Sequence, residues 1–270
     1  MLFFPNVKIN IGLNILTRRD DGFHDIETLM IPVGLCDSLE FIKAKEFSFS
    51  SSGIVLDVNS DNNLCTKAYE LLKKIYQLPA ISMHLHKAIP TGAGLGGGSA
   101  DAAFLLKNLN NYFKLNITDK DLKDHAATLG SDCPFFIENK PSLAYGRGEI
   151  LESFDVDLTK YKIIIAHPGI HVNTAWAYKN SIPNSNRRKL KSLLGSNHIT
   201  NWRNIITNDF EIVVFSVYPE IKELKDKMYN LGAVYSSMTG SGSAVYGIFE
   251  ENEVDYTQHF SCFVWQGKIK

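Results

Sequence analysis

A glycine-rich segment in the middle of the chain constrains the fold more than any other feature. It reads Pro90-Thr91-Gly92-Ala93-Gly94-Leu95-Gly96-Gly97-Gly98-Ser99-Ala100, with five glycines in seven positions. Glycine loses more backbone entropy on folding than any other residue. This density therefore indicates a place where many backbone N–H groups converge on one ligand. The apolar residues of 102–109 predict a buried helix directly afterwards, and a helix N-terminus facing such a loop is suited to a phosphate chain.

Two general phosphate-binding patterns fit this segment only in part. Glycines at 92, 94 and 97 satisfy G-x-G-x-x-G, but residues 87–91 separate them from the preceding strand, whereas a dinucleotide-binding turn follows its strand directly. The P-loop pattern also nearly fits, but the lysine expected before Ser99 is missing. An enzyme that uses this segment for phosphoryl transfer must bring its cation from elsewhere. Lys8 and Lys87 are the two candidates.

Hydrophobic periodicity predicts a mixture of strands and helices. Residues 7–15 alternate between apolar and polar, which indicates a strand with Lys8 and Asn10 together on a polar face outside the core. The segment 180–200, which holds Arg187-Arg188-Lys189, is the best candidate for a boundary, or else a solvated loop or helix face. The pattern as a whole predicts an α+β fold with two lobes. Further strands are expected at 38–43, 47–50, 54–57, 81–85, 161–166, 233–237 and 244–249, and helices at 64–75, 118–129 and 204–230.

Composition excludes several classes of protein. The formal net charge is −1 over 270 residues, so wholesale binding to nucleic acid or to an anionic membrane is not expected. The four cysteines are far apart and form no C-x-x-C pair, which argues against a zinc ribbon or a disulfide scaffold. No apolar run approaches the ~18 residues of a membrane helix, and the N-terminus lacks the pattern of a secretory signal. A cytoplasmic enzyme is expected.

Three motifs, taken in order, resemble those of one kinase superfamily. The glycine-rich segment is similar to the nucleotide-binding loop of the galactokinase, homoserine kinase, mevalonate kinase and phosphomevalonate kinase superfamily. Pro5–Asn10 resembles its first motif and Met238–Gly242 its third. The resemblance covers nearly the whole chain. It implies two α+β lobes: an ATP-binding lobe at residues 1–150, similar to a ribosomal S5-type domain, and a C-terminal lobe at 151–270.

Further segments resemble one branch of this superfamily. They are Arg18–His24, Leu129–Phe136 and Asn208–Glu211. That branch uses ATP to phosphorylate a tertiary hydroxyl on a small molecule that carries a cytidine diphosphate group, in isoprenoid precursor biosynthesis. The resemblance implies no nucleic acid or membrane partner. The chain departs from the usual pattern at Phe23, where tyrosine is common, and at Cys133, where valine is common.

The resemblance assigns the catalytic residues. Asp132 is the carboxylate near the substrate hydroxyl, and Lys8 is the cation that spans hydroxyl and phosphate. Physically, a lysine there keeps the aspartate ionised and stabilises developing charge. Residues 90–100 are expected to hold ATP as its Mg²⁺ complex, with Ser99 near phosphate or metal and no dedicated metal site on the protein. The adenine is expected near Asn59–Leu64.

The resemblance also assigns residues to the substrate. Phe23 and His24 are expected near the cytosine, with Tyr178 stacking on it, while Asn10 and Thr239 line the site. Each of these has an ordinary structural alternative, such as a surface turn or helix packing. Two other functions stay open. One is a sibling kinase acting on mevalonate, phosphomevalonate or homoserine, for which His24 and Tyr178 are not needed. The other is a nucleotide-binding homologue without catalysis.

Overall fold

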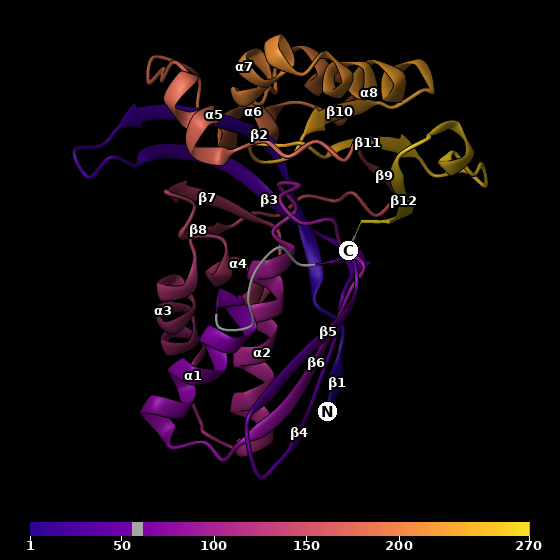
Figure 1. Ribbon diagram of the computed structural model, residues 1–270. Helices are drawn as coiled ribbons and strands as arrows, with labels where there is room; N and C mark the ends of the chain where they lie inside the picture. Colours follow the sequence, from indigo (N-terminus) through magenta and orange to yellow (C-terminus); the bar gives the residue numbers. More distant parts are fainter. Residues whose placement is uncertain (56–61, 270) are drawn as a thin grey trace. The chain divides into compact units, whose positions relative to one another are not determined.

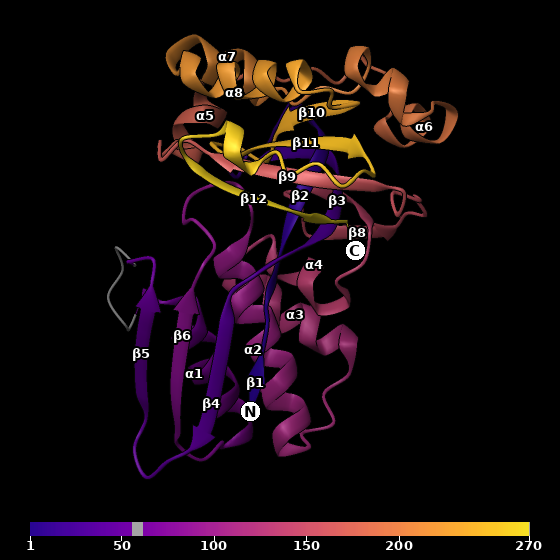
Figure 2. The ribbon, with the colours of Figure 1, turned by 90° about the vertical axis from the view of Figure 1, so that its right-hand side faces the viewer.

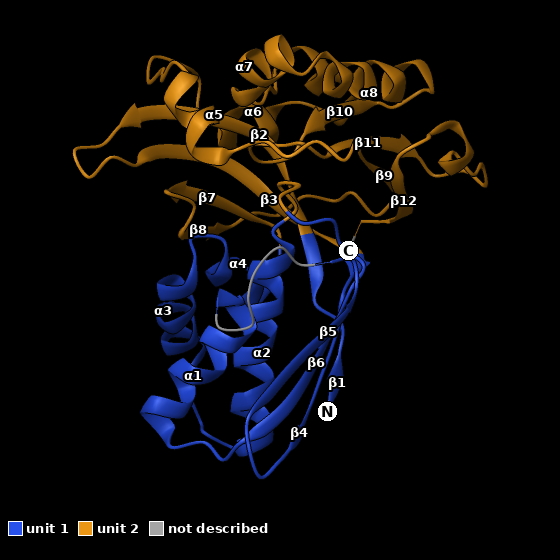
Figure 3. Cartoon of the chain, viewed as in Figure 1, with its two compact units in different colours: residues 1–7, 35–91, 96–140 blue, residues 8–34, 92–95, 141–270 orange. Residues whose placement is uncertain are grey.

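The computed structural model describes residues 1–55 and 62–269, which form two compact units (Figure 3). Unit 1 is Met1–Val7, Leu35–Thr91 and Gly96–Lys140, and unit 2 is Lys8–Gly34, Gly92–Leu95 and Pro141–Lys270. The units are therefore discontinuous in sequence and differ from the expected contiguous lobes 1–150 and 151–270. A lobe boundary at residue 150 stays a prediction. The segment 180–200 lies wholly within unit 2, so the chain does not divide there.

Unit 1 is a four-stranded sheet with helices against it. The strand order is β1-β4-β6-β5, with β5 parallel to β6 and the other pairs antiparallel. Figure 2 shows the open face of this sheet, with α1 and α2 behind it. The strands are β1 (Leu2–Phe3), β4 (Ser38–Lys43), β5 (Ser48–Gly53) and β6 (Ile81–Lys87), and the helices are α1 (Leu64–Tyr76), α2 (Gly97–Phe113), α3 (Asp119–Leu129) and α4 (Cys133–Glu138).

Local capping explains where two of these helices begin and end. The Asn63 side chain accepts a hydrogen bond from the backbone N–H of Cys65 (2.8 Å) at the start of α1. Thr118 caps α3 in the same way, through the N–H of Asp121, and α3 ends at Gly130. Such caps satisfy backbone donors that lack partners within the helix. The helices expected at 64–75 and 118–129 are confirmed.

Unit 2 contains two four-stranded sheets and most of the C-terminal helices (Figure 1). The orders are β2-β3-β7-β8 and β10-β11-β9-β12. The strands are β2 (Asn6–Arg18), β3 (His24–Cys36), β7 (Ser142–Gly146), β8 (Ile150–Ser153), β9 (Tyr161–His167), β10 (Tyr235–Met238), β11 (Val245–Glu250) and β12 (Phe263–Lys268). The helices are α5 (Thr174–Asn180), α6 (Leu190–Ser196), α7 (Phe210–Val217), α8 (Pro219–Asn230) and the 3₁₀ helices η2 (Ile199–Asn204) and η3 (Thr257–His259).

The core of unit 2 lies between the second sheet and the helices α5, α7 and α8. Ile164 and Val245 from the sheet pack with Phe210, Val214 and Met228 from the helices, and all five are buried. The helical stretch expected at 204–230 is broken into α7 and α8, because Tyr218 is not helical and Pro219 opens α8. The strand expected at 54–57 is not formed by residues 54 and 55, and residues 56 and 57 lie outside the described residues.

Candidate active site

The first half of the glycine-rich segment belongs to unit 2 and approaches the third motif closely. Gly92 and Gly94 have positive φ angles of 63° and 76°. A Cβ atom on Gly94 would overlap the carbonyl oxygen of Thr239. The N–H of Ala244 also donates to the carbonyl of Ala93 (3.1 Å). Glycine is therefore required at 94 both for its backbone conformation and for this close approach.

Lys8 is held against this segment by hydrogen bonds. Its amino group donates to the side-chain oxygen of Asn10 (2.6 Å) and to the carbonyl oxygen of Gly94 (3.0 Å). Thr239 Oγ1 donates to the same two acceptors, Asn10 Oδ1 and Gly94 O, each at 3.2 Å. Within unit 2 the structure therefore brings together four of the residues that the sequence assigned to the site. A lysine cation is fixed beside a loop suited to phosphate.

The expectation that Lys8 and Asn10 lie outside the core on a polar face of β2 is wrong. Lys8 and Asn10 are only 3% and 2% exposed. Burial of polar groups is tolerated when their hydrogen bonds are satisfied. Besides accepting from Lys8, the Asn10 side chain donates to Thr28 Oγ1 (3.1 Å), and its backbone carbonyl accepts from Tyr246 (2.8 Å). Asn10 thus positions Lys8 and joins β2 to its neighbours.

The second half of the glycine-rich segment belongs to unit 1, where it opens α2. Gly96 occupies the N-cap position with φ 71°, and no side chain caps the helix there. The first intrahelical hydrogen bond runs from the N–H of Ala100 to the carbonyl of Gly96 (2.8 Å). The N–H groups of residues 97–99 precede it and have no acceptor within the helix. Together with the helix dipole they suit an anion.

Asp132 also lies in unit 1, and its neighbour in the sequence, Cys133, contacts Ser99. Asp132 stands at the N-cap position of α4, yet its carboxylate forms no capping hydrogen bond, so capping does not explain this residue. Ser99 hydrogen-bonds to the thiol of its neighbour Cys133, whose pKa is raised by burial to about 12. Ser99 therefore adjoins the turn that carries Asp132. Lys8 belongs to unit 2, so its pairing with Asp132 stays a prediction.

Two of the three residues expected around the cytosine, His24 and Tyr178, are in contact within unit 2. The ring of His24 stacks on that of Tyr178, with centroids 4.8 Å apart and an interplanar angle of 19°. Phe23 is 52% exposed and lies under the guanidinium of Arg147, 4.8 Å from the ring centroid. Burial, aided by the charge of Arg18, lowers the pKa of His24 below its ordinary value of 6.5. The imidazole is therefore neutral at pH 7, with one donor and one acceptor nitrogen.

A buried group of three charges beside α2 corrects the expectation for Lys87. Lys87 forms ion pairs with Asp37 and with Asp101 (2.9 Å for the latter), and all three residues are at most 3% exposed. Asp37 Oδ1 also accepts from the N–H groups of Ala88 and Ile89. Lys87 is thus committed to two carboxylates rather than to a phosphate, and Asp101 is its partner on α2. The three residues are up to 64 positions apart in the sequence, so the sequence did not reveal that they form one group.

Neither a metal cluster nor a membrane span is found in the described chain. Residues 1–55 and 62–269 contain no group of three or more His, Cys, Asp or Glu side chains arranged to hold a metal ion. No helix in those ranges is long and apolar enough to cross a bilayer. The expected adenine rim, Asn59–Leu64, falls partly outside the described residues; of the part that is described, Leu64 begins α1.

Two family models match this chain. The model for the GHMP kinases N terminal domain matches residues 63–140, and the model for GHMP kinases C terminal matches residues 188–258. Together they cover more than half of the sequence. The glycine-rich segment, the buried Lys8 and the third motif therefore belong to a chain with the GHMP kinase fold. The α+β fold class expected from the sequence is confirmed.

Relatives that match over almost the whole chain identify one family within the GHMP kinases. The 4-diphosphocytidyl-2-C-methyl-D-erythritol kinase of Azobacteroides pseudotrichonymphae genomovar. CFP2 is 48% identical, covering 93% of this chain and 94% of its own. The kinase of the same name from Cytophaga hutchinsonii is 46% identical, with 97% of each chain covered. A solved structure of 4-(cytidine 5'-diphospho)-2C-methyl-D-erythritol kinase superimposes with a TM-score of 0.84 at 29% identity, covering 100% and 99%. This chain belongs to the 4-diphosphocytidyl-2-C-methyl-D-erythritol kinase family.

Proposed function

We propose that this protein transfers the γ-phosphoryl group of ATP to the 2-hydroxyl of 4-diphosphocytidyl-2-C-methyl-D-erythritol, giving the 2-phosphate and ADP in isoprenoid precursor biosynthesis. The observation that carries the proposal is the position of Lys8, whose amino group is hydrogen-bonded to Gly94 in the glycine-rich segment. A phosphoryl-transfer site needs such a cation, and the segment itself supplies none. We place the reaction in the cytoplasm, where ATP is available.

ATP is proposed to lie along the glycine-rich segment. Backbone N–H groups at the start of α2 would receive its phosphates, and the positive φ angles of Gly92, Gly94 and Gly96 shape the segment around them. Mg²⁺ would arrive bound to the nucleotide, because Mg²⁺ is commonly held by substrate phosphates and water with only one or two protein ligands. Ser99, at the first turn of α2, is the residue proposed to approach it.

Catalysis is proposed to rest on charge and position. Phosphoryl transfer proceeds mainly through a loose transition state, so the protein acts chiefly by alignment and charge stabilisation. Lys8 would neutralise charge between the attacking oxygen and the γ-phosphoryl group. Asp132 would orient the tertiary hydroxyl and accept its proton as the new O–P bond forms and the bond to the ADP oxygen breaks. Asn10 and Thr239 would hold Lys8 in place.

Recognition of the cytidine group is proposed to use the stacked pair of rings. Tyr178 would stack on the cytosine, and neutral His24 would read its edge with one donor and one acceptor. The face of Tyr178 on which His24 now stacks is an aromatic surface suitable for a base. His24 would then move from that face to the edge of the bound ring. Phe23 would add a further aromatic contact.

The position of the new phosphate tests this proposal. The purified protein is incubated with Mg-ATP and 4-diphosphocytidyl-2-C-methyl-D-erythritol, and the product is examined by ³¹P NMR. Carbon 2 carries no hydrogen, so a phosphomonoester there shows no three-bond coupling to a proton. Phosphate on a primary or secondary hydroxyl would show that coupling. A monoester resonance split by a three-bond coupling, or no new monoester at all, would contradict the proposal.

A further inference from the structure

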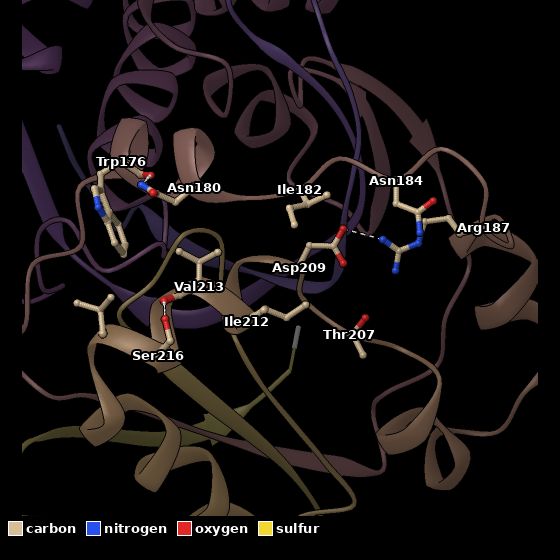
Figure 4. Close-up of a pocket in the computed structure, with 11 residues that line it drawn as sticks. Trp176, Asn180, Ile182, Asn184, Arg187, Thr207, Asp209, Ile212, Val213 and Ser216 are labelled. Carbon is tan, nitrogen blue, oxygen red and sulfur yellow. Dashed lines mark hydrogen bonds and ion pairs between the residues drawn. The ribbon is translucent and has the colours of Figure 1, made fainter.

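Unit 2 contains a groove that the proposed reaction does not use. It has a volume of about 710 Å³ and lies between α5, the segment that follows α5, and α7 (Figure 4). Pockets for small molecules are usually about 300–1,000 Å³. None of the residues that line it was assigned to ATP, to the cytidine group or to catalysis. The groove is therefore a candidate for a second ligand.

The walls of the groove expose apolar side chains. Ile182, Ile212 and Val217 are 87%, 79% and 51% exposed, and Trp176 lies at one end. Large apolar side chains that share one concave surface favour a ligand with an apolar body, because covering them removes hydrocarbon from water. The apolar part of the ligand is expected to lie along α7.

The other end of the groove carries an ion pair between Arg187 and Asp209. Arg187 Nη1 donates to Asp209 Oδ2 (2.6 Å), and the same oxygen accepts from the N–H of Ile15 (2.8 Å), so β2 helps to hold the carboxylate. Asp209 is the hydrogen-bond partner found for Arg187 among the described residues, which leaves most of the guanidinium donors for a ligand. Figure 4 shows this pair far from Trp176.

The local charge around the groove favours an anion. Exposed Arg188 and Lys189 follow Arg187 directly, and Lys179 is exposed on α5. Residues 176–189 contain four Lys or Arg and no Asp or Glu, in a chain whose net charge is −1. The single carboxylate at the groove, Asp209, is shared between Arg187 and β2. We propose that the groove binds a small amphiphilic anion, with an aliphatic chain over Ile212 and Val217 and a phosphate group at Arg187.

The groove and the cytidine residues share two helices. Trp176 and Asn180 are four residues apart on α5 and line the groove, while Tyr178 between them stacks on His24. Phe210, the first residue of α7, contacts Tyr178 edge-on (4.8 Å, 82°), and Ile212 on the same helix lines the groove. A ligand that holds α5 against α7 therefore stabilises the His24–Tyr178 stack. This consequence rests on the proposed function and predicts competition with the cytidine-bearing substrate.

Direct binding tests the site without reference to catalysis. n-Octyl phosphate, kept below its critical micelle concentration, is titrated into the protein while tryptophan emission is followed. Saturable binding at one site is expected, with a signal that Trp176→Phe removes. Arg187→Gln and Ile212→Asn should each weaken binding about tenfold, because one loses a charged contact and the other an apolar one. Ile42→Asn, at an exposed isoleucine of unit 1, is the matched control and should bind as the parent does.

Three results would contradict the proposed binding site. The first is equal binding of n-octyltrimethylammonium or 1-octanol, which removes the role of Arg187. The second is an affinity that Ile212→Asn and Arg187→Gln leave unchanged. The third is a dimer in sedimentation that Ile212→Asn dissociates, which makes a second copy the occupant. For the parent protein, octyl phosphate should raise the KM for the cytidine-bearing substrate at least threefold and leave the KM for ATP unchanged. Binding without that rise contradicts the coupling, whereas absence of kinase activity with intact binding contradicts only the proposed function.

Discussion

The amino group of Lys8 donates a hydrogen bond of 3.0 Å to the carbonyl oxygen of Gly94. The backbone N–H of Lys8 also donates to the carbonyl of Leu95, again at 3.0 Å. Strand β2 is thus joined to the glycine-rich segment by both the backbone and the side chain of one residue. This relationship ties the position of a cation to the conformation of the loop proposed to hold phosphate.

Replacement of Lys8 by methionine should remove catalysis while leaving the fold. Methionine has a similar length but no charge, and losing one stabilising group of this kind typically lowers kcat by about 10²–10³-fold. Steady-state ADP release measures kcat, and circular dichroism checks the fold. Lys43→Met, at an exposed lysine of β4, is the control and should retain parental kcat. A Lys8→Met protein with more than a tenth of parental kcat would contradict the assigned role.

Replacement of Gly94 by alanine should lower both stability and nucleotide affinity. The new Cβ would overlap Thr239 O, and the φ of 76° is strained for any residue but glycine. A loss of about 2 kcal/mol in the free energy of unfolding is expected, together with a higher KM for ATP. Gly98→Ala is the matched control for stability, because its Cβ would lie 3.8 Å from Leu64 Cδ1, an ordinary van der Waals contact. Urea unfolding of both variants compares them, and equal stability would contradict the close approach.

Replacement of His24 by alanine should raise the KM for the cytidine-bearing substrate without a comparable rise in the KM for ATP. If His24 reads the cytosine edge, the KM for the cytidine-bearing substrate should rise at least tenfold, while the KM for ATP stays within about twofold. His198→Ala, at an exposed histidine, controls for loss of an imidazole elsewhere. Equal losses for both substrates would remove His24 from the cytosine site.

Protonation of His24 should raise the KM for the cytidine-bearing substrate at low pH. Burial lowers the pKa of His24 below 6.5, so the ring is neutral above that pH and becomes charged as the pH falls through the lowered value. The KM for the cytidine-bearing substrate should be constant from pH 7 to 8 and rise below pH 6.5, because the acceptor nitrogen is lost on protonation. Initial rates at several pH values measure this, and His24→Gln should flatten the profile. A parental KM that rises instead above pH 7 would contradict it.

The buried carboxylate of Asp101 should make stability depend on pH. Burial raises its pKa from 3.8 to about 7, partly opposed by Lys87 and reinforced by Asp37. A carboxyl group with a higher pKa in the folded protein binds its proton more tightly there, so the free energy of unfolding falls as pH rises from about 4 to beyond 7. Asp101→Asn should reduce that fall by about 1 kcal/mol or more. Urea unfolding at pH 5 and pH 8 tests this, and parallel profiles for the two proteins would contradict it.

Elements with strong local signals were predictable from the sequence. Helices α1 and α3 follow from an apolar stripe flanked by capping residues, and β9 follows from a short apolar run. Strand β3 gave no such signal, because most of its residues are buried and it therefore lacks the alternation of a half-exposed strand. Burial on both faces also explains the wrong prediction for β2. Lys8 and Asn10 are buried there because their hydrogen bonds are satisfied, which periodicity does not reveal.

Some site residues were also recognisable from the sequence, whereas others were brought together only by the fold. The glycine-rich segment was recognisable because its composition has a direct physical meaning, and its motif led to Lys8, Asn10 and Thr239, which do meet. The role of Lys87 was not recognisable, because Asp37 is 50 positions away in the sequence and only the fold brings them together. The groove beside α5 was equally hidden, since its walls come from separate segments and its basic run resembles an ordinary solvated loop.

Substrate selectivity decides between the proposed reaction and that of a sibling kinase. Purified protein and Mg-ATP are given 4-diphosphocytidyl-2-C-methyl-D-erythritol, mevalonate, phosphomevalonate and homoserine in separate reactions, and ADP release is followed by a coupled assay. ADP release above the background ATPase rate is expected with the cytidine-bearing substrate alone, and Lys8→Met should abolish it. Release with one of the other alcohols, or with none of the four, would contradict the proposed reaction.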